Sequence, residues 1–144
     1  MSKSSAPIAV RILPSKNEGW TTTRVIESDS LAGMYPLGYN KHVLNTLLRS
    51  SDFDAWLSHL ADQKAKARIL ARLTSAIFGN FGDCGPVGEG VSEMRIHTGP
   101  GYRVYYTRTG STIYVLLAAG VKASQTKDMA KAKKMARELK RTKP

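Results

Sequence analysis

Hydrophobic residues recur with the helical period in three segments of this chain. In the first segment, Phe53, Trp56, Leu57 and Leu60 are spaced three and four residues apart, which places them on one face of a short amphipathic helix. The same spacing continues toward the C-terminus in two further stripes: Ile69, Leu70, Leu73 and Ile77, then Met129, Ala132, Met135, Ala136 and Leu139.

Capping residues agree with these three helices. Ser50-Ser51-Asp52 precede the first stripe with good N-cap chemistry, Asp62 can cap the second helix and Ser124 the third. Gly79-Asn80 predict the end of the second helix.

Strand patterns occupy most of the remaining sequence. Residues 43–48, 91–97, 102–108 and 112–118 are predicted strands, and the last is continuously apolar, which is typical of a central strand. Gly120 is expected to end it. Residues 81–90 contain four glycines and one proline, so they are expected to form a loop. The order β-α-α-β-β-β-α predicts a small α+β domain, with a mostly antiparallel sheet and helices packed on one face.

The first 40 residues have a different character. Two short apolar stretches, at 8–13 and 20–26, predict either two weak strands or a loosely ordered extension. We therefore divide the chain into an N-terminal extension at 1–40 and a domain at 41–144.

The charge of the chain predicts a polyanionic partner. The 144 residues include 22 Lys and Arg against 11 Asp and Glu, a formal charge of +11. Residues 41–144 hold 18 of the basic and 8 of the acidic side chains. Such a surplus most often serves nucleic acid or an acidic protein. A single cysteine, Cys84, excludes an internal disulfide framework and favours a reducing cytoplasm, and no apolar run approaches membrane-spanning length.

Candidate chemistry lies on one face of two predicted strands. Alternation places Arg95 and His97 on one face of 91–97, and Arg103 and Tyr105 on one face of 102–108, with Lys122 just beyond the last strand. Guanidinium groups bind phosphate and a tyrosine ring can stack on a base, so this face is a plausible RNA platform. The same groups can cleave RNA without a metal, with cations stabilising the phosphorane and His97 or Tyr105 moving protons. In the alternative interpretation, Arg95 and Arg103 face solvent and pair with Glu93.

Two helices carry further basic residues. The second predicted helix has Lys64, Lys66, Arg68 and Arg72 opposite its apolar stripe, and the last helix includes Lys131 and Lys134. These side chains are expected to contact RNA phosphates, although a solvated helix face has the same pattern. The histidines are scattered and no phosphate-binding loop occurs, so no metal or cofactor is expected.

Several segments resemble a known family. The chain contains, in order, FDAWL at 53–57, ARI at 67–69, GNFGD at 79–83, PVGEGVSEMRI at 86–96, GPGYRVYY at 99–106 and KASQ at 122–125. This succession resembles the addiction-module killer proteins, toxins of type II toxin–antitoxin systems in the RelE/ParE superfamily, close to its HigB-like branch. The resemblance covers roughly residues 41–141.

The resemblance implies a microbial-RNase-like toxin fold with two N-terminal helices and a C-terminal helix. It also implies a metal-independent mRNA interferase that acts on the translating ribosome in the cytoplasm and inhibits translation. A cognate antitoxin, typically a helix-turn-helix protein, would neutralise it. Arg103 corresponds to a phosphate-contacting residue of the family, Arg95 and Lys122 are placed similarly, and Gln125 of the last motif joins the expected RNA-binding set.

Two other functions fit the same sequence. ParE-like relatives inhibit DNA gyrase by protein contact without catalysis. A decayed toxin that retains only antitoxin binding is the other alternative, because the family usually carries Lys and Asp where this chain has Gly85 and Val121.

Overall fold

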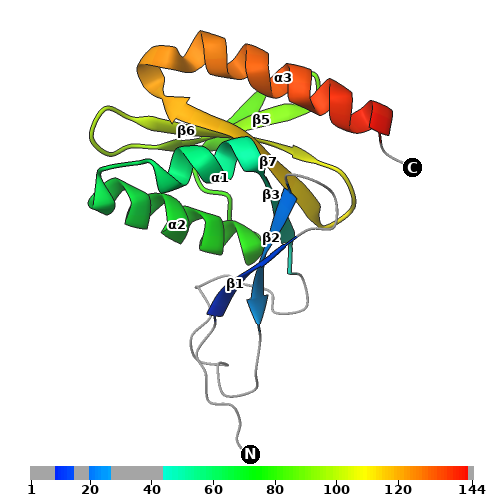
Figure 1. Cartoon of the computed structure of the whole chain (residues 1–144), viewed down its shortest axis with the longest axis horizontal. Helices are drawn as coiled ribbons and strands as arrows, with labels where there is room; N and C mark the ends of the chain where they lie inside the picture. Colours follow the sequence, from blue (N-terminus) through cyan, green and yellow to red (C-terminus); the bar gives the residue numbers. More distant parts are fainter. Residues whose placement is uncertain (1–8, 15–19, 27–43, 143–144) are drawn as a thin grey trace, which may run out of the picture.

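The computed structural model describes residues 9–14, 20–26 and 44–142, with side chains described over 44–141 (Figure 1). Its elements follow one another as β1 (Ala9–Pro14), β2 (Trp20–Ile26), β3 (Thr46–Ser50), α1 (Ser51–Ser58), α2 (Gln63–Ile77), β4 (Cys84–Gly88), β5 (Val91–Ile96), β6 (Tyr102–Arg108), β7 (Ile113–Val121), the 3-10 turn η2 (Lys122–Ser124) and α3 (Gln125–Thr142). The chain is thus α+β, as the hydrophobic pattern predicts.

The strands form one mixed sheet in the order β1-β2-β3-β7-β6-β5-β4. Five of the six neighbouring pairs are antiparallel, and the exception is the parallel pair β3–β7. The continuously apolar strand β7 lies at the centre, as expected. The two stretches near the N-terminus pair as strands β1 and β2 and extend the sheet beyond β3. Other residues of the segment 1–40 lie outside the described part of the chain.

Helices cover both faces of the sheet, which corrects the expectation that all of them pack on one face. Figure 1 shows α1 and α2 on one side of the strands and α3 on the other. The two helices expected at the N-terminus of the domain, α1 and α2, come after strand β3 in the chain. The expected C-terminal helix is α3. The sheet therefore has two buried faces and two hydrophobic clusters.

The larger cluster lies between the sheet and the helices α1 and α2. Phe53, Ile69 and Leu73 of the predicted stripes are completely or almost completely buried against Met94 and Val104 of the sheet. The spacing in the sequence thus gives the correct inward faces of both helices, except that Leu70 of the predicted stripe is exposed. Their N-caps are also the predicted ones, because Ser50 accepts a hydrogen bond from the Phe53 N–H, and Asp62 accepts from the N–H groups of Lys64 and Ala65.

The smaller cluster lies beneath α3. Ala132 and Ala136 of this helix are buried against Val91, Tyr105 and Leu117, with Met129, Met135 and Leu139 packed around them. The two alanines allow α3 to approach the sheet closely. A bulge in β7 interrupts its pairing with β6. Tyr105 pairs with Ala118, whereas the next residue, Tyr106, pairs with Leu116, so that one residue of β7 is left over.

Three local predictions are wrong. Residues 84–88, expected as part of a loop, form the edge strand β4. Gly120 does not end the central strand, which continues to Val121. The strand expected at 43–48 spans Thr46–Ser50 instead.

Candidate functional site

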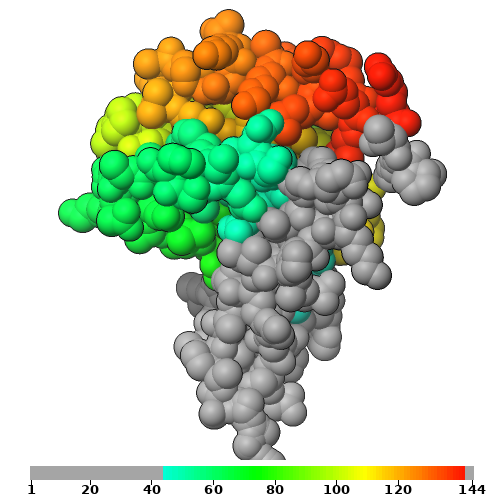
Figure 2. All heavy atoms as spheres, in the orientation of Figure 1, coloured from blue at the N-terminus to red at the C-terminus, as the bar shows by residue number. Residues whose placement is uncertain are grey.

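The residues predicted to share a face gather at one end of the sheet. There β5 and β7 end, β6 begins, and the helices α2 and α3 both start nearby (Figure 1). Arg95 pairs with Arg103 across β5 and β6, and Arg103 pairs with Gly120 across β6 and β7. Figure 2 shows the connection between β5 and β6, in yellow-green, at the surface between the two helical layers. The shared face predicted from alternation is therefore present.

Glu93 joins the two arginines of this face. Its Oε2 accepts hydrogen bonds from Arg95 Nε at 3.0 Å and from Arg103 Nη1 at 2.7 Å. The Glu93 side chain is 5% exposed, whereas those of Arg103 and Arg95 are 12% and 31% exposed. A buried carboxylate thus fixes two guanidinium groups that partly reach solvent. This is the pairing with Glu93 that the alternative interpretation anticipates.

Asp83 extends the row of charges to the imidazole. Its Oδ1 accepts from Arg95 Nη1 at 2.7 Å, and its Oδ2 lies 2.6 Å from Nε2 of the exposed His97. The hydrogen bonds from His97 and Arg95 lower the pKa of the Asp83 carboxyl, and Asp83 in turn raises the pKa of Arg95. Asp83 therefore stays ionised and can hold the imidazole in one orientation. We call His97, Asp83, Arg95, Glu93 and Arg103 the charged row.

Arg72 of α2 holds the segment that carries Asp83. Its guanidinium donates to the carbonyl oxygens of Arg95 at 2.7 Å, Phe81 at 2.9 Å and Asp83 at 3.3 Å. The backbone N–H of Arg95 also donates to the Asp83 carbonyl at 2.8 Å. Arg72 thus fixes the backbone beside the charged row.

The ring of Tyr105 is not accessible from solvent, which corrects the expectation that it stacks on a base. Its ring is completely buried under α3, and its hydroxyl has no hydrogen-bond partner among the described residues. Burial, together with the nearby charges of Glu93 and Asp128, raises the pKa of Tyr105 to about 12. The phenol is therefore neutral near pH 7 and unsuited to act as a base.

The start of α3 lies next to the charged row. The exposed Lys122 donates its backbone N–H to the Gly101 carbonyl at 2.9 Å, which ties η2 to the turn before β6. Ser124 donates to Asp128, and a β-carbon at Gly120 would collide with that Asp128 carboxylate. Gly120 is thus required by the close approach of α3, and the half-buried Gln125 begins the helix.

The basic residues of the helices are divided among several surfaces. Lys64, Arg68 and Arg72 line a pocket beside the end of β5, whereas Lys66 lines a second hollow with Arg49 and Asp54. On α3, Lys131 and Lys134 are exposed, and Lys131 Nζ lies 3.8 Å from a carboxylate oxygen of Asp52. The four basic residues of α2 therefore do not act as one face.

Sequence reasoning missed the role of Asp83, which connects His97 to Arg95. Glu93 is expected only in the alternative interpretation, as the partner of Arg95 and Arg103, and it binds both. The missing signal was β4: once it pairs with β5, Cys84 lies opposite Met94 and Asp83 falls beside Arg95. Without that strand, no sequence pattern brings residue 83 to residues 95 and 97.

The described residues contain no group of three or more His, Cys, Asp or Glu side chains placed to hold a metal ion. Over the same part of the chain, no helix is both long and apolar enough to cross a membrane.

Comparison with known proteins finds a relative of this chain. The chain is 47% identical to an uncharacterized protein of Haemophilus influenzae over 87 residues, which are 60% of this chain and 88% of the relative. No family model and no solved structure matches the sequence. The chain therefore belongs to the same family as this Haemophilus influenzae protein.

Proposed function

We propose that this protein is the toxin of a type II toxin–antitoxin system, with the microbial-RNase-like toxin fold, and that it cleaves mRNA on the ribosome without a metal. A cognate antitoxin, typically a helix-turn-helix protein, neutralises it. The single observation that carries the proposal is the charged row, which holds an imidazole and two guanidinium groups together at one end of the sheet.

Four residues of the charged row have roles in the proposed cleavage, and Glu93 holds the two arginines in place. His97, oriented by Asp83, accepts the proton of the ribose 2′-hydroxyl. The 2′-oxygen then bonds to the neighbouring phosphorus, the bond from phosphorus to the 5′-oxygen breaks, and that oxygen takes a proton from solvent. Arg95 and Arg103 stabilise the added negative charge of the phosphorane, and the exposed Lys122 offers a further cation beside them. Tyr105 stays beneath α3 as a packing residue.

One observation favours a second candidate function. Both guanidinium groups are already neutralised by carboxylates, Arg103 by Glu93 and Arg95 by Glu93 and Asp83. A phosphate must therefore compete with these ion pairs. This arrangement suits a non-catalytic protein of the same fold, either a ParE-like inhibitor of DNA gyrase or a toxin that retains only antitoxin binding.

Arg103→Ala tests the catalytic proposal. Induction of the wild-type protein is expected to arrest growth and to create new 5′ ends within coding regions of cellular mRNA, and Arg103→Ala is expected to abolish both. Loss of one stabilising cation from such a site typically lowers the rate by about 100-fold or more. The matched control is Arg108→Ala, which removes a guanidinium from the opposite end of the same strand, where Arg108 donates only to the Gly110 and Ser111 carbonyls.

The outcomes separate the candidate functions. Growth arrest with intact transcripts and DNA-damage signalling would favour gyrase inhibition, and absence of arrest by the wild type would favour a decayed toxin. Arrest and cleavage that persist in Arg103→Ala would show that the charged row is not the site. Thermal unfolding of each purified variant verifies that loss of activity is not loss of the fold.

A further inference from the structure

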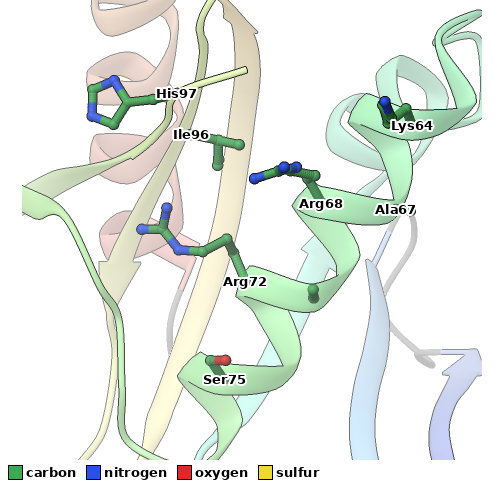
Figure 3. A pocket seen from close by; sticks show the side chains of 8 residues that line it. Lys64, Ala67, Arg68, Arg72, Ser75, Ile96 and His97 are labelled. Atoms are coloured by element: carbon green, nitrogen blue, oxygen red, sulfur yellow. The ribbon is translucent and has the colours of Figure 1, made fainter.

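A pocket lies between α2 and the end of β5, on the face of the sheet opposite to α3. It has a volume of about 620 Å³ and is lined by Lys64, Ala67, Arg68, Ala71, Arg72, Ser75, Ile96 and His97. Figure 3 shows Lys64, Arg68, Arg72 and Ser75 along one side of α2, with the two arginine side chains extending toward the end of β5. The volume lies within the range of about 300–1,000 Å³ that is typical of small-ligand sites.

The cations of this pocket are not neutralised by carboxylates. Lys64 and Arg68 are exposed and form no ion pair with any described residue, and Arg72 donates only to neutral carbonyl groups. Lys64, Arg68 and Arg72 are spaced four residues apart, so they follow one face of α2. Asp62, the nearest acidic residue in sequence, uses Oδ1 to cap the helix. An anion can therefore bind in the pocket without displacing a carboxylate, whereas at the charged row it must compete with Asp83 and Glu93.

The floor of the pocket is apolar. The exposed methyl groups of Ala67 and Ala71 lie on α2, and the buried Ile96 projects from β5. The small side chains leave apolar surface uncovered between the cations, where a base can make apolar contacts while its phosphate meets Lys64 or Arg68. An anion without an apolar part would leave this floor uncovered.

His97 connects the pocket to the charged row. It lines the pocket and also pairs with Asp83, so an RNA chain bound at the charged row can reach the pocket by passing around His97 at the end of the sheet. We infer that the pocket binds one nucleotide of single-stranded RNA next to the scissile phosphodiester, with its base on Ala67, Ala71 and Ile96 and its phosphate on Lys64 and Arg68. This inference rests on the proposed function, because it takes the charged row as the place of cleavage.

Binding of a short RNA tests the pocket separately from cleavage. The probe is a fluorescent hexanucleotide with 2′-O-methyl groups, which block the attacking hydroxyl so that only binding is measured by anisotropy. Arg68→Gln is expected to weaken binding about tenfold, the usual effect of losing a charged hydrogen bond. It is also expected to lower the slope of log K against log salt by about 0.7, the value for one phosphate of a single strand. Lys140→Gln, which removes an exposed cation of α3 on the other face of the sheet, is the matched control and should leave both quantities unchanged.

Two further measurements identify the bound group. A photoreactive 4-thiouridine in the hexanucleotide is expected to crosslink to residues of α2, and inorganic phosphate at equal concentration is expected not to displace the probe. Equal binding by Arg68→Gln and Lys140→Gln, crosslinks elsewhere, or full displacement by phosphate would overturn the inference. Displacement by polyglutamate with no effect of the base would instead indicate a site for an acidic peptide.

The pocket and the proposed function can fail independently. If the wild type cleaves mRNA and Arg103→Ala does not, while Arg68→Gln binds the probe normally, the pocket inference is wrong and the function stands. If Arg68→Gln weakens binding but the wild type cleaves nothing, the protein binds RNA through this pocket and the proposed cleavage is wrong.

Discussion

Glu93 has one carboxylate oxygen bound to two guanidinium groups, and its other oxygen has no hydrogen-bond partner among the described residues. Directly across the β5–β6 pair, the Tyr105 hydroxyl is buried and has no partner in the same part of the chain. Unpaired polar atoms in a buried place lower stability, and they commonly persist where function requires them. Glu93, which has one of these two unpaired atoms, also fixes Arg95 and Arg103.

Replacement of Glu93 by Gln tests its bridging role. The amide keeps the shape of the carboxylate but removes its charge, so two charge-assisted hydrogen bonds become neutral-acceptor ones. We expect a loss of about 1–3 kcal/mol in the free energy of unfolding, measured by urea denaturation. Glu89→Gln is the matched control, because Glu89 forms an exposed pair with Arg137 at 2.7 Å and such pairs contribute only about 0–1 kcal/mol. Equal losses for both variants would contradict the bridging role.

Tyr105→Phe tests the buried hydroxyl. Because the pKa of Tyr105 is raised to about 12 from an ordinary value of 10.0, the folded state favours the neutral phenol. This contribution is fully present below pH 10 and is lost as the pH rises from 10 to 12, where the unfolded chain ionises first. We expect urea denaturation to show a smaller loss of stability across this interval in Tyr105→Phe than in the wild type. At pH 7 the variant should be as stable as the wild type or slightly more so, because no hydrogen bond is lost.

The sequence predicts which residues share a face but not what covers that face. Alternation correctly separates Arg103 and Tyr105 from Tyr102 and Val104, because a strand has a period of two. The expected exposure of Tyr105 was wrong because the side of the sheet on which α3 packs is set by the connection after β7. No periodicity within α3 contains that information.

At the scale of elements, the edge strand β4 is the part of the fold that the sequence conceals. Its residues Cys84-Gly85-Pro86-Val87-Gly88 have low strand propensity, and their side chains alternate between exposed and half-buried. An edge strand tolerates glycine and proline because it pairs on one side only. The helices were predicted correctly because their stripes and caps are local features, whereas β4 depends on its pairing with β5.

The hydrogen bonds from Arg72 of α2 to the segment before β4 give a prediction at the scale of elements. Arg72→Leu keeps much of the apolar stem but removes the guanidinium that donates to the carbonyls of Phe81, Asp83 and Arg95, so that the Asp83 carbonyl retains only the Arg95 N–H among these donors. We expect a loss of about 1–3 kcal/mol in the free energy of unfolding and faster hydrogen exchange at the Arg95 amide, which donates to Asp83. The control is Arg68→Leu on the same face of α2, because Arg68 is exposed and should change stability by no more than about 0.5 kcal/mol. Unchanged exchange in Arg72→Leu would show that another contact holds this segment.

At the scale of the whole molecule, the positive charge is divided among surfaces of different character. The charged row is almost balanced by Asp83 and Glu93, the α2 pocket is not balanced, and α3 presents exposed lysines on the far side of the sheet. Composition predicts the surplus and its concentration after residue 40. It does not predict this division, because the balance at each place depends on which carboxylates the tertiary structure brings there.

The parallel pair β3–β7 joins residues 46–49 to residues 113–116. The helices α1 and α2 and three strands lie between them in the chain. The centre of the sheet therefore cannot form until more than 110 residues have been synthesised. Strands so distant in sequence pair slowly, because a long loop must close before their contacts form. β7 also supports the charged row, because Arg103 pairs with Gly120 of that strand. In the toxin that we propose, activity therefore arises only after this late pairing, which gives a co-produced antitoxin time to bind.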